Sequence, residues 1–145
     1  MDAATIERNK AAVRGFFAAL NERRLDALRD VMAPDVVDHN KIIHGEVDAP
    51  GAAFGALAQQ LDAFDPYHAE VEEVVAEGDR VVARITQTGT HSGAHPRMPR
   101  PTGRSFRNEA IFVFTLADGR ITEIHGVADR LGLFLQLGWD WPTAG

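Results

Sequence analysis

The stretch of sequence that decides the fold consists of two apolar runs on either side of a tight turn. The first run covers residues 106–116 (FRNEAIFVFTL), the turn contains Asp118-Gly119, and the second run covers residues 121–129 (ITEIHGVAD). Both runs are rich in β-branched and aromatic residues, and Asp-Gly between two such runs is a strong signal for an antiparallel hairpin. The sequence therefore predicts that these two strands lie side by side in a sheet.

The register of this hairpin predicts which side chains share a face. Pairing Leu116 with Ile121 and continuing without interruption brings Asn108 opposite Asp129, and opposed residues point to the same face. One face is then expected to carry Phe106, Asn108, Ala110, Phe112, Phe114, His125, Val127 and Asp129. A mostly apolar face with an amide, an imidazole and a carboxylate toward one end is typical of a small-molecule pocket. A slip of one residue would send this set to the other face.

The rest of the chain predicts helices first and strands afterwards. Apolar residues at helical spacing predict helices over residues 5–20, over residues 25–32, and from Pro50 to a stop at Pro66. Extended segments are expected over residues 35–40, 69–77 and 80–91, with a turn at Gly78-Asp79 and a loop over residues 93–103.

This order predicts one α+β domain over residues 1–145. The N-terminal helices are expected to pack in a strongly bent antiparallel sheet, because helices that precede a meander of strands cover one face of that sheet. We expect such a sheet to form a cone with one apolar pocket.

The composition excludes several classes of protein. With no cysteine among 145 residues, the chain has no disulfide, no thiolate nucleophile and no cysteine-ligated metal. The 15 basic and 21 acidic residues give a net charge of −6, which argues against nucleic acid or an anionic membrane as the main partner. No apolar run approaches the ~20 residues of a membrane span. No signal peptide is visible, so a cytoplasmic location is expected.

Histidines and carboxylates remain as candidates for acid–base chemistry. Asp129 has two interpretations: it ends the strand and caps the turn that follows, or it is a desolvated carboxylate at the mouth of an apolar cavity that takes and returns a proton. The candidate histidines also have structural interpretations. His125 is then a half-buried residue bonded to a backbone carbonyl, His39 belongs to a surface Asp-His pair, and His91 caps a loop.

No metal or nucleotide site is predicted. Four side chains could converge at the mouth of the cone, namely His39, His91, His125 and Asp129, but they lack ordinary ligand spacing. His91 and His95 are four residues apart, but they lie in a Gly/Pro-rich loop. The arginine-rich stretch over residues 97–107 lacks interleaved aromatic residues and indicates a solvated loop or a contact to an anionic substrate. No glycine-rich phosphate loop follows a strand.

Several segments resemble one known family. Residues 118–138, DGRITEIHGVADRLGLFLQLG, resemble the pattern D-G-k-I-x-E-x-W-x-x-x-D-x-x-G-L-x-x-Q-L-G of the SnoaL-like polyketide cyclases, also called ester cyclases. Further matches are Gly89-Thr90-His91-Ser92-Gly93, Pro101-Thr102-Gly103-Arg104, residues 9–17 and Asp38-His39-Asn40. The resemblance covers nearly the whole chain.

This resemblance implies both a fold and a reaction. The implied fold is the cone of nuclear transport factor and ketosteroid isomerase, often dimeric. The implied reaction closes a ring of an aromatic polyketide by intramolecular aldol condensation, without metal or cofactor. Asp129 corresponds to the family's acid–base residue, whereas His125 replaces the usual tryptophan. That departure puts the reaction, more than the fold, in question.

We therefore expect a cofactor-free cyclase acting on a small hydrophobic substrate that contains carbonyl groups. In the expected mechanism Asp129 removes a proton α to a carbonyl, and an imidazole together with Asn108 stabilises the enolate oxygen. The candidate catalytic residues are Asp129, His125, His91 and His39. The candidate substrate-binding residues are Asn108, Phe112, Phe17, Asn40, Tyr67 and Trp139.

Other interpretations stay open at this point. The same pocket would suit another cofactor-free isomerase, dehydratase or hydrolase, a metal-dependent enzyme, or a non-catalytic dimer that binds a small ligand. A homodimer is expected from the resemblance, with an exposed sheet face as its surface. The terminal Trp139-Asp140-Trp141-Pro142 is expected to form a buried aromatic plug rather than to close the pocket or join the interface.

Overall fold

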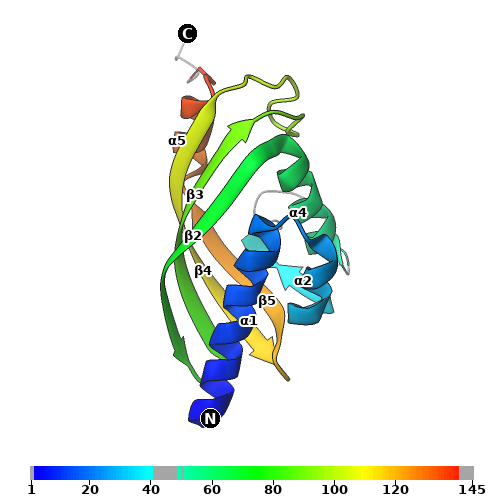
Figure 1. Ribbon diagram of the computed structural model, residues 1–145, viewed down its shortest axis with the longest axis vertical. Coiled ribbons are helices and arrows are strands. Elements are labelled where there is room, and N and C mark those ends of the chain that lie inside the picture. The colour runs from blue at the N-terminus through cyan, green and yellow to red at the C-terminus, as the bar shows by residue number, and fades with distance from the viewer. Residues whose placement is uncertain (1, 41–48, 50, 141–145) are drawn as a thin grey trace.

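The computed structural model describes residues 2–40, 49 and 51–140 of the chain (Figure 1). Its elements are, in order, α1 (Ala3–Asn21), α2 (Leu25–Val31), β1 (Met32–Asp38), α4 (Ala52–Ala63), β2 (Phe64–Glu77), β3 (Arg80–His91), β4 (Ser105–Ala117), β5 (Arg120–Ala128) and α5 (Arg130–Gln136). The α+β prediction is confirmed, while the extent of the domain over residues 1–145 stays a prediction.

Two predicted helix ends are wrong, because a strand begins where the helical pattern was expected to finish. Met32 starts β1 and pairs with Ile121, and Phe64 starts β2 and pairs with His91. Both side chains are almost fully buried, so their packing in the sheet overrides the helical spacing of the neighbouring apolar residues. Pro50 lies outside the described residues.

The five strands form one curled sheet in the order β1-β5-β4-β3-β2. The strands β2 to β5 pair antiparallel as predicted, whereas β1 runs parallel to β5. The sheet is therefore mixed, because β1 comes from the helical first half of the chain and adds to the far edge of the meander. Figure 1 shows the sheet bending round α1, with α2 and α4 on the same side.

Helix α1 fills the hollow of the sheet. Its buried face consists of Asn9, Ala12, Val13, Phe16, Phe17, Ala19 and Leu20. The helix begins at a cap, where the Asp2 carboxylate accepts a 2.8 Å hydrogen bond from the Thr5 N–H, and this bond lowers the pKa of Asp2. At its other end the Asn21 amide makes two hydrogen bonds with the backbone of Ala69, of 2.7 and 3.0 Å. These bonds fix α1 against β2.

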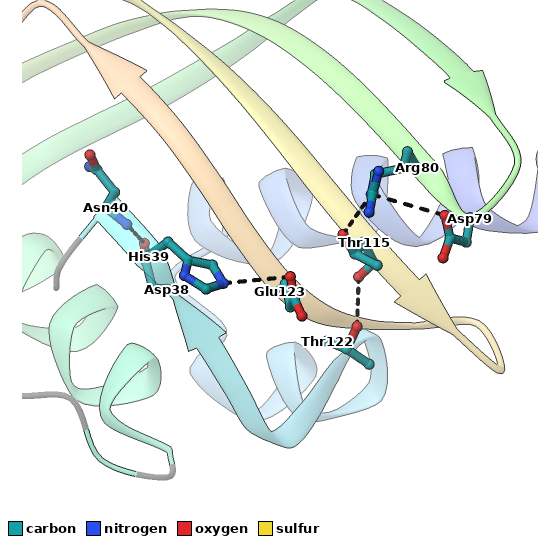
Figure 2. Close-up of polar contacts among 8 residues, drawn as sticks. All are labelled: Asp38, His39, Asn40, Asp79, Arg80, Thr115, Thr122 and Glu123. Carbon is teal, nitrogen blue, oxygen red and sulfur yellow. Dashed lines mark hydrogen bonds and ion pairs between the residues drawn. The ribbon is translucent and has the colours of Figure 1, made fainter. Parts of the chain in front are cut away.

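The hairpin of β4 and β5 contains a bulge that changes which side chains share a face. Leu116 pairs with Ile121 as predicted, but Thr115 pairs with Glu123, so Thr122 is an additional residue in β5. The Thr122 hydroxyl donates to the Thr115 carbonyl over 3.1 Å (Figure 2). An additional residue inverts the alternation of the strand that carries it.

The face predicted for β4 is therefore correct, and the one predicted for β5 is wrong. Phe106, Asn108, Ala110, Phe112 and Phe114 point into the cone, where Ile124, Gly126 and Ala128 meet them across the hairpin. His125 and Val127 point to the outer face, His125 opposite Val113 and Val127 opposite Ile111.

None of the described helices has the length and the apolar character that crossing a membrane requires. The cytoplasmic location stays a prediction.

Candidate active site

The inside of the cone holds a cavity of about 670 Å³. Its apolar walls come from α1 (Phe16, Phe17, Leu20), α4 (Ala53, Leu57), the sheet (Ile85, Phe106, Phe112, Ile124) and α5 (Leu133, Phe134). The volume lies in the range of small-molecule sites, which span about 300–1,000 Å³. The predicted apolar pocket is present among the described residues.

A strip of polar side chains crosses this apolar wall. The Tyr67 hydroxyl donates to Gln87 Oε1 over 2.6 Å, and Gln60 Nε2 donates to the same oxygen over 3.3 Å. Gln87 Nε2 donates in turn to Asn108 Oδ1 over 3.4 Å, and Asn108 Nδ2 donates to the Asp129 carbonyl over 3.0 Å. Burial raises the pKa of Tyr67, so its hydroxyl stays protonated and can donate. The strip supplies hydrogen-bond donors inside a cavity with mostly apolar walls.

Charged side chains also belong to the cavity lining. Among the described residues, Asp38 is the one carboxylate in the lining, and its Oδ1 accepts the Asn40 N–H over 3.0 Å (Figure 2). Arg97, Arg130 and His95 also belong to the lining. Arg97 is the member of the predicted arginine-rich stretch that reaches the cavity. Both signs of charge are thus available to a bound substrate.

Five of the six predicted substrate-binding residues lie at this cavity: Asn108, Phe112, Phe17, Asn40 and Tyr67. Trp139 is not in the lining. It follows α5, its N–H donates to the Phe134 carbonyl over 2.9 Å, and its side chain is 39% exposed. The expectation that Trp139 forms a buried plug is wrong, while Trp141 lies outside the described residues.

Asp129 caps the helix α5. Its Oδ1 accepts the Gly132 N–H over 2.8 Å, and its side chain is exposed and outside the cavity lining. A side chain at residue 132 would collide with this carboxylate, since a Cβ built there lies 2.1 Å from Asp129 Oδ2. The neighbours Ala128 and Arg130 do line the cavity. Asp129 therefore stands beside the cavity with its carboxylate turned away from it.

The rest of the C-terminal motif holds α5 against the sheet. The Gln136 side chain bonds the backbone of Arg107 in the way that a neighbouring strand would. Its Oε1 accepts the Arg107 N–H over 2.8 Å, and its Nε2 donates to the Arg107 carbonyl over 2.9 Å. Leu137 is 1% exposed. The D-x-x-G and Q-L-G parts of the motif thus position the helix that closes one end of the cavity.

His91 is fully buried at the base of the loop over residues 92–104 and does not line the cavity. Its Nδ1 accepts the Thr102 N–H over 3.2 Å, and its backbone bonds Gly103 and Arg104. The surroundings match the loop-capping interpretation, and its catalytic role stays a prediction.

His39 and His125 meet on the outer face of the sheet. Their rings stack with centroids 4.1 Å apart and planes at 9°. Glu123 lies beside them, with its Oε2 3.5 Å from His39 Nε2 (Figure 2). The structure brings together two of the four predicted catalytic residues, but outside the cavity.

Among the polar residues of the site, sequence reasoning missed Gln60, Gln87 and Asp38. Gln87 had a signal, because Val81, Ala83, Ile85 and Gln87 alternate along one strand and place an amide on an apolar face. Asp38 and Gln60 had none, since each stands in a segment whose neighbours do not reveal which side faces the cavity.

The fold and the cavity define a cone-shaped α+β protein with an internal small-molecule site. The chain belongs to the SnoaL-like polyketide cyclase family, whose family model matches residues 10–137. It is thus an enzyme of the cyclase type, and the family implies a small hydrophobic substrate.

Three similar proteins illustrate this membership. Aklanonic acid methyl ester cyclase DauD from Streptomyces sp. (strain C5) is 32% identical, and the match covers 90% of this chain and 82% of DauD. Nogalonic acid methyl ester cyclase from Streptomyces nogalater is also 32% identical, covering 86% and 93%. The solved structure of TsrD from Streptomyces laurentii superposes with a TM-score of 0.81 at 26% identity, covering 95% and 98%.

Proposed function

We propose that this chain closes a ring in a polyketide ester by an intramolecular aldol-type reaction that needs no cofactor. The observation that carries the proposal is the cavity itself, in which apolar walls surround an internal strip of hydrogen-bond donors. The two cyclases described above are named for methyl esters of polyketide acids, which supports an ester as the substrate class.

The proposed chemistry combines one carbon–carbon bond formation with two proton transfers. A carboxylate takes a proton from the carbon α to one carbonyl, and the resulting enolate carbon attacks a second carbonyl of the same molecule. A carbon–carbon bond forms, the attacked oxygen becomes an alkoxide, and the protonated carboxyl returns its proton to it. Asn108 Nδ2 has a second N–H beside the one bonded to the Asp129 carbonyl, and it can donate this N–H to the enolate oxygen. The Tyr67 hydroxyl would have to leave Gln87 to do the same.

Asp129 is the carboxylate that the family pattern favours. To reach the substrate it must release the Gly132 N–H and turn toward the cavity that Ala128 and Arg130 line. Losing such a helix cap costs about 1 kcal/mol, which substrate binding can offset.

Asp38 is the alternative acid–base residue, because it already lines the cavity. The two assignments can be told apart by mutation. Asp129 also caps the helix α5, so a substitution there can change stability as well as activity.

The variants Asp129→Asn and Asp38→Asn test this assignment. Asparagine caps helices about as well as aspartate, so Asp129→Asn keeps the cap and removes the proton transfer. We expect kcat on a ring-closing polyketide ester to fall about 10²–10⁴-fold in Asp129→Asn, with the melting temperature unchanged and a smaller effect in Asp38→Asn. Full activity of Asp129→Asn, with the loss found in Asp38→Asn instead, would assign the proton transfer to Asp38 and leave Asp129 as a helix cap.

We also propose that the chain forms a homodimer through the outer face of the sheet. Apolar side chains lie exposed there on adjoining strands: Val75 (61%), Val82 (36%), Ile111 (50%) and Val127 (77%). Cross-strand pairing places Val75 beside Val82 and Ile111 beside Val127. Exposed apolar side chains on four neighbouring strands support a protein–protein contact at this face.

A further inference from the structure

We propose that His39, Glu123 and His125 form a binding site for a divalent transition metal ion such as Zn²⁺, on the face of the sheet opposite the cavity. One ligand atom from each of these three residues lies within 4.8 Å of the other two. Two imidazoles and one carboxylate form a ligand set that Zn²⁺ accepts, with a fourth position left for water.

The parallel pairing of β1 with β5 brings the three residues together. Asp38, the last residue of β1, pairs with Ile124, so His39, which follows it, lies beside the two residues that flank Ile124 in β5. Those two residues are Glu123 and His125, which point to the same face because they are two positions apart in a strand. The bulge at Thr122 puts both of them on the outer face.

The spacing of the ligand atoms suits a tetrahedral ion. Ligands about 2.1 Å from a tetrahedral Zn²⁺ lie about 3.4 Å from one another. His39 Nε2 and Glu123 Oε2 are 3.5 Å apart (Figure 2), so this pair needs almost no movement. The His125 ring is stacked on His39 and must tilt for its lone pair to converge with the other two, and its exposed side chain leaves room for that.

A second observation at this cluster is a buried nitrogen that makes no hydrogen bond. His39 Nε2 is buried and makes no hydrogen bond among the described residues, although Glu123 Oε2 lies within ion-pair distance of it. Buried polar atoms are nearly always paired with protein, water or an ion. A bound cation would satisfy this nitrogen and would also balance the Glu123 carboxylate.

The bound ion would fix the position of the segment around His39 and would take no part in the reaction. His39 stands between Asp38 and Asn40, and both neighbours line the cavity. Coordination would hold this segment to β5 from the outside, so the site should stabilise the fold while the ring closure proceeds in the cavity.

Calorimetric titration of the tag-free, metal-stripped full chain with ZnCl₂ tests the site. We expect one ion per chain and a melting temperature that rises with Zn²⁺ concentration. Loading with Co²⁺ should give the visible absorption of a low-coordinate nitrogen and oxygen site.

Three variants separate coordination from other effects. Glu123→Gln and His125→Phe should each weaken Zn²⁺ binding at least ~10-fold, the order of loss seen when a metal site loses a supporting group. Phenylalanine keeps the ring that stacks on His39. The control is His68→Ala, which removes an exposed histidine 3.0 Å from Glu70 and should leave binding unchanged. Absence of stoichiometric binding to the wild-type chain, or equal binding by all three variants, would overturn the proposal.

Discussion

At the scale of single residues, Gly126 sets the width of the cavity. A Cβ added at this position would lie 2.4 Å from Phe112 Cδ1 and 2.6 Å from Phe112 Cε1. Phe112 is part of the cavity lining. The absence of a side chain at residue 126 therefore leaves room for the Phe112 ring beside β5.

Gly126→Ala should narrow the cavity and strain the sheet. The added methyl group must push Phe112 aside, and such overpacking costs about 1–3 kcal/mol of the free energy of unfolding. We expect urea denaturation to show this loss, and KM for a polyketide ester to rise more than kcat falls. Gly55→Ala is the matched control: its Cβ meets nothing within 4 Å in the interior of α4, and alanine should stabilise that helix by up to about 1 kcal/mol. An unchanged KM in Gly126→Ala would show that Phe112 does not limit the cavity.

The sequence predicted the types of site residue better than their orientations. Phe17, Phe112, Tyr67 and Asn108 were placed at the cavity, because large apolar residues and a lone amide on an apolar strand face have few other places to go. For Asp129 the sequence offered a cap and a catalytic base as alternatives. The structure shows the cap, and the catalytic role stays a prediction, because one carboxylate can serve both purposes and only a change of rotamer separates them.

At the scale of elements, the bulge in β5 decides which side chains of this strand face the cavity and which face outward. The Thr122 hydroxyl satisfies the Thr115 carbonyl at the point where the ladder is interrupted. This bond stabilises a register that a regular hairpin would not adopt.

Thr122→Val should therefore destabilise the hairpin. Valine has nearly the same shape but cannot donate, so the Thr115 carbonyl would lose a partner at a cost of about 0.5–1.5 kcal/mol. Chemical denaturation of the purified chain measures this difference. Thr88→Val on β3 is the control, because no hydrogen bond of the Thr88 hydroxyl is found within the described part of the chain, and it should change stability little. Equal stability of the two variants would mean that the bulge does not depend on the hydroxyl.

The sequence predicted where β3, β4 and β5 lie but could not predict this bulge. The boundaries of β3 at residues 80–91 were correct, and those of β4 and β5 were correct to within one residue. The bulge lies at Ile121, Thr122 and Glu123. None of these residues is a glycine or a proline, so the sequence does not reveal that an additional residue is inserted there. The choice of face in β5 was therefore wrong, because it depended on uninterrupted alternation.

At the scale of the whole molecule, the exposed apolar patch of the sheet should decide the state of association. Ile111→Glu would place a charged carboxylate in the proposed interface, opposite Arg84, and removing such charges from water costs several kcal/mol per ion. We expect sedimentation equilibrium to show a dimer for the wild-type chain and a dissociation constant at least ~100-fold higher for the variant. Leu25→Glu alters a comparably exposed apolar residue on α2, 36% exposed, and should leave the dimer intact. A wild-type monomer would refute the proposed interface.

The overall cone followed from the order of helices and strands, which is a property of the whole chain. The parallel partnership of β1 with β5 did not, since Met32 and Ile121 are separated by most of the sequence and no local pattern connects them. The outer cluster of His39, Glu123 and His125 was missed for the same reason.

The strand order leaves β2 as an open edge of the sheet, and its sequence limits how molecules can aggregate. An exposed edge is a template for strand addition from another chain. Here the edge carries Pro66, the carboxylates of Glu70, Glu72, Glu73 and Glu77, and two interruptions of its register with β3. Prolines, charges and irregularities are the features that block edge-to-edge pairing. Copies of this chain should therefore resist fibrillar assembly through β2 even at high concentration.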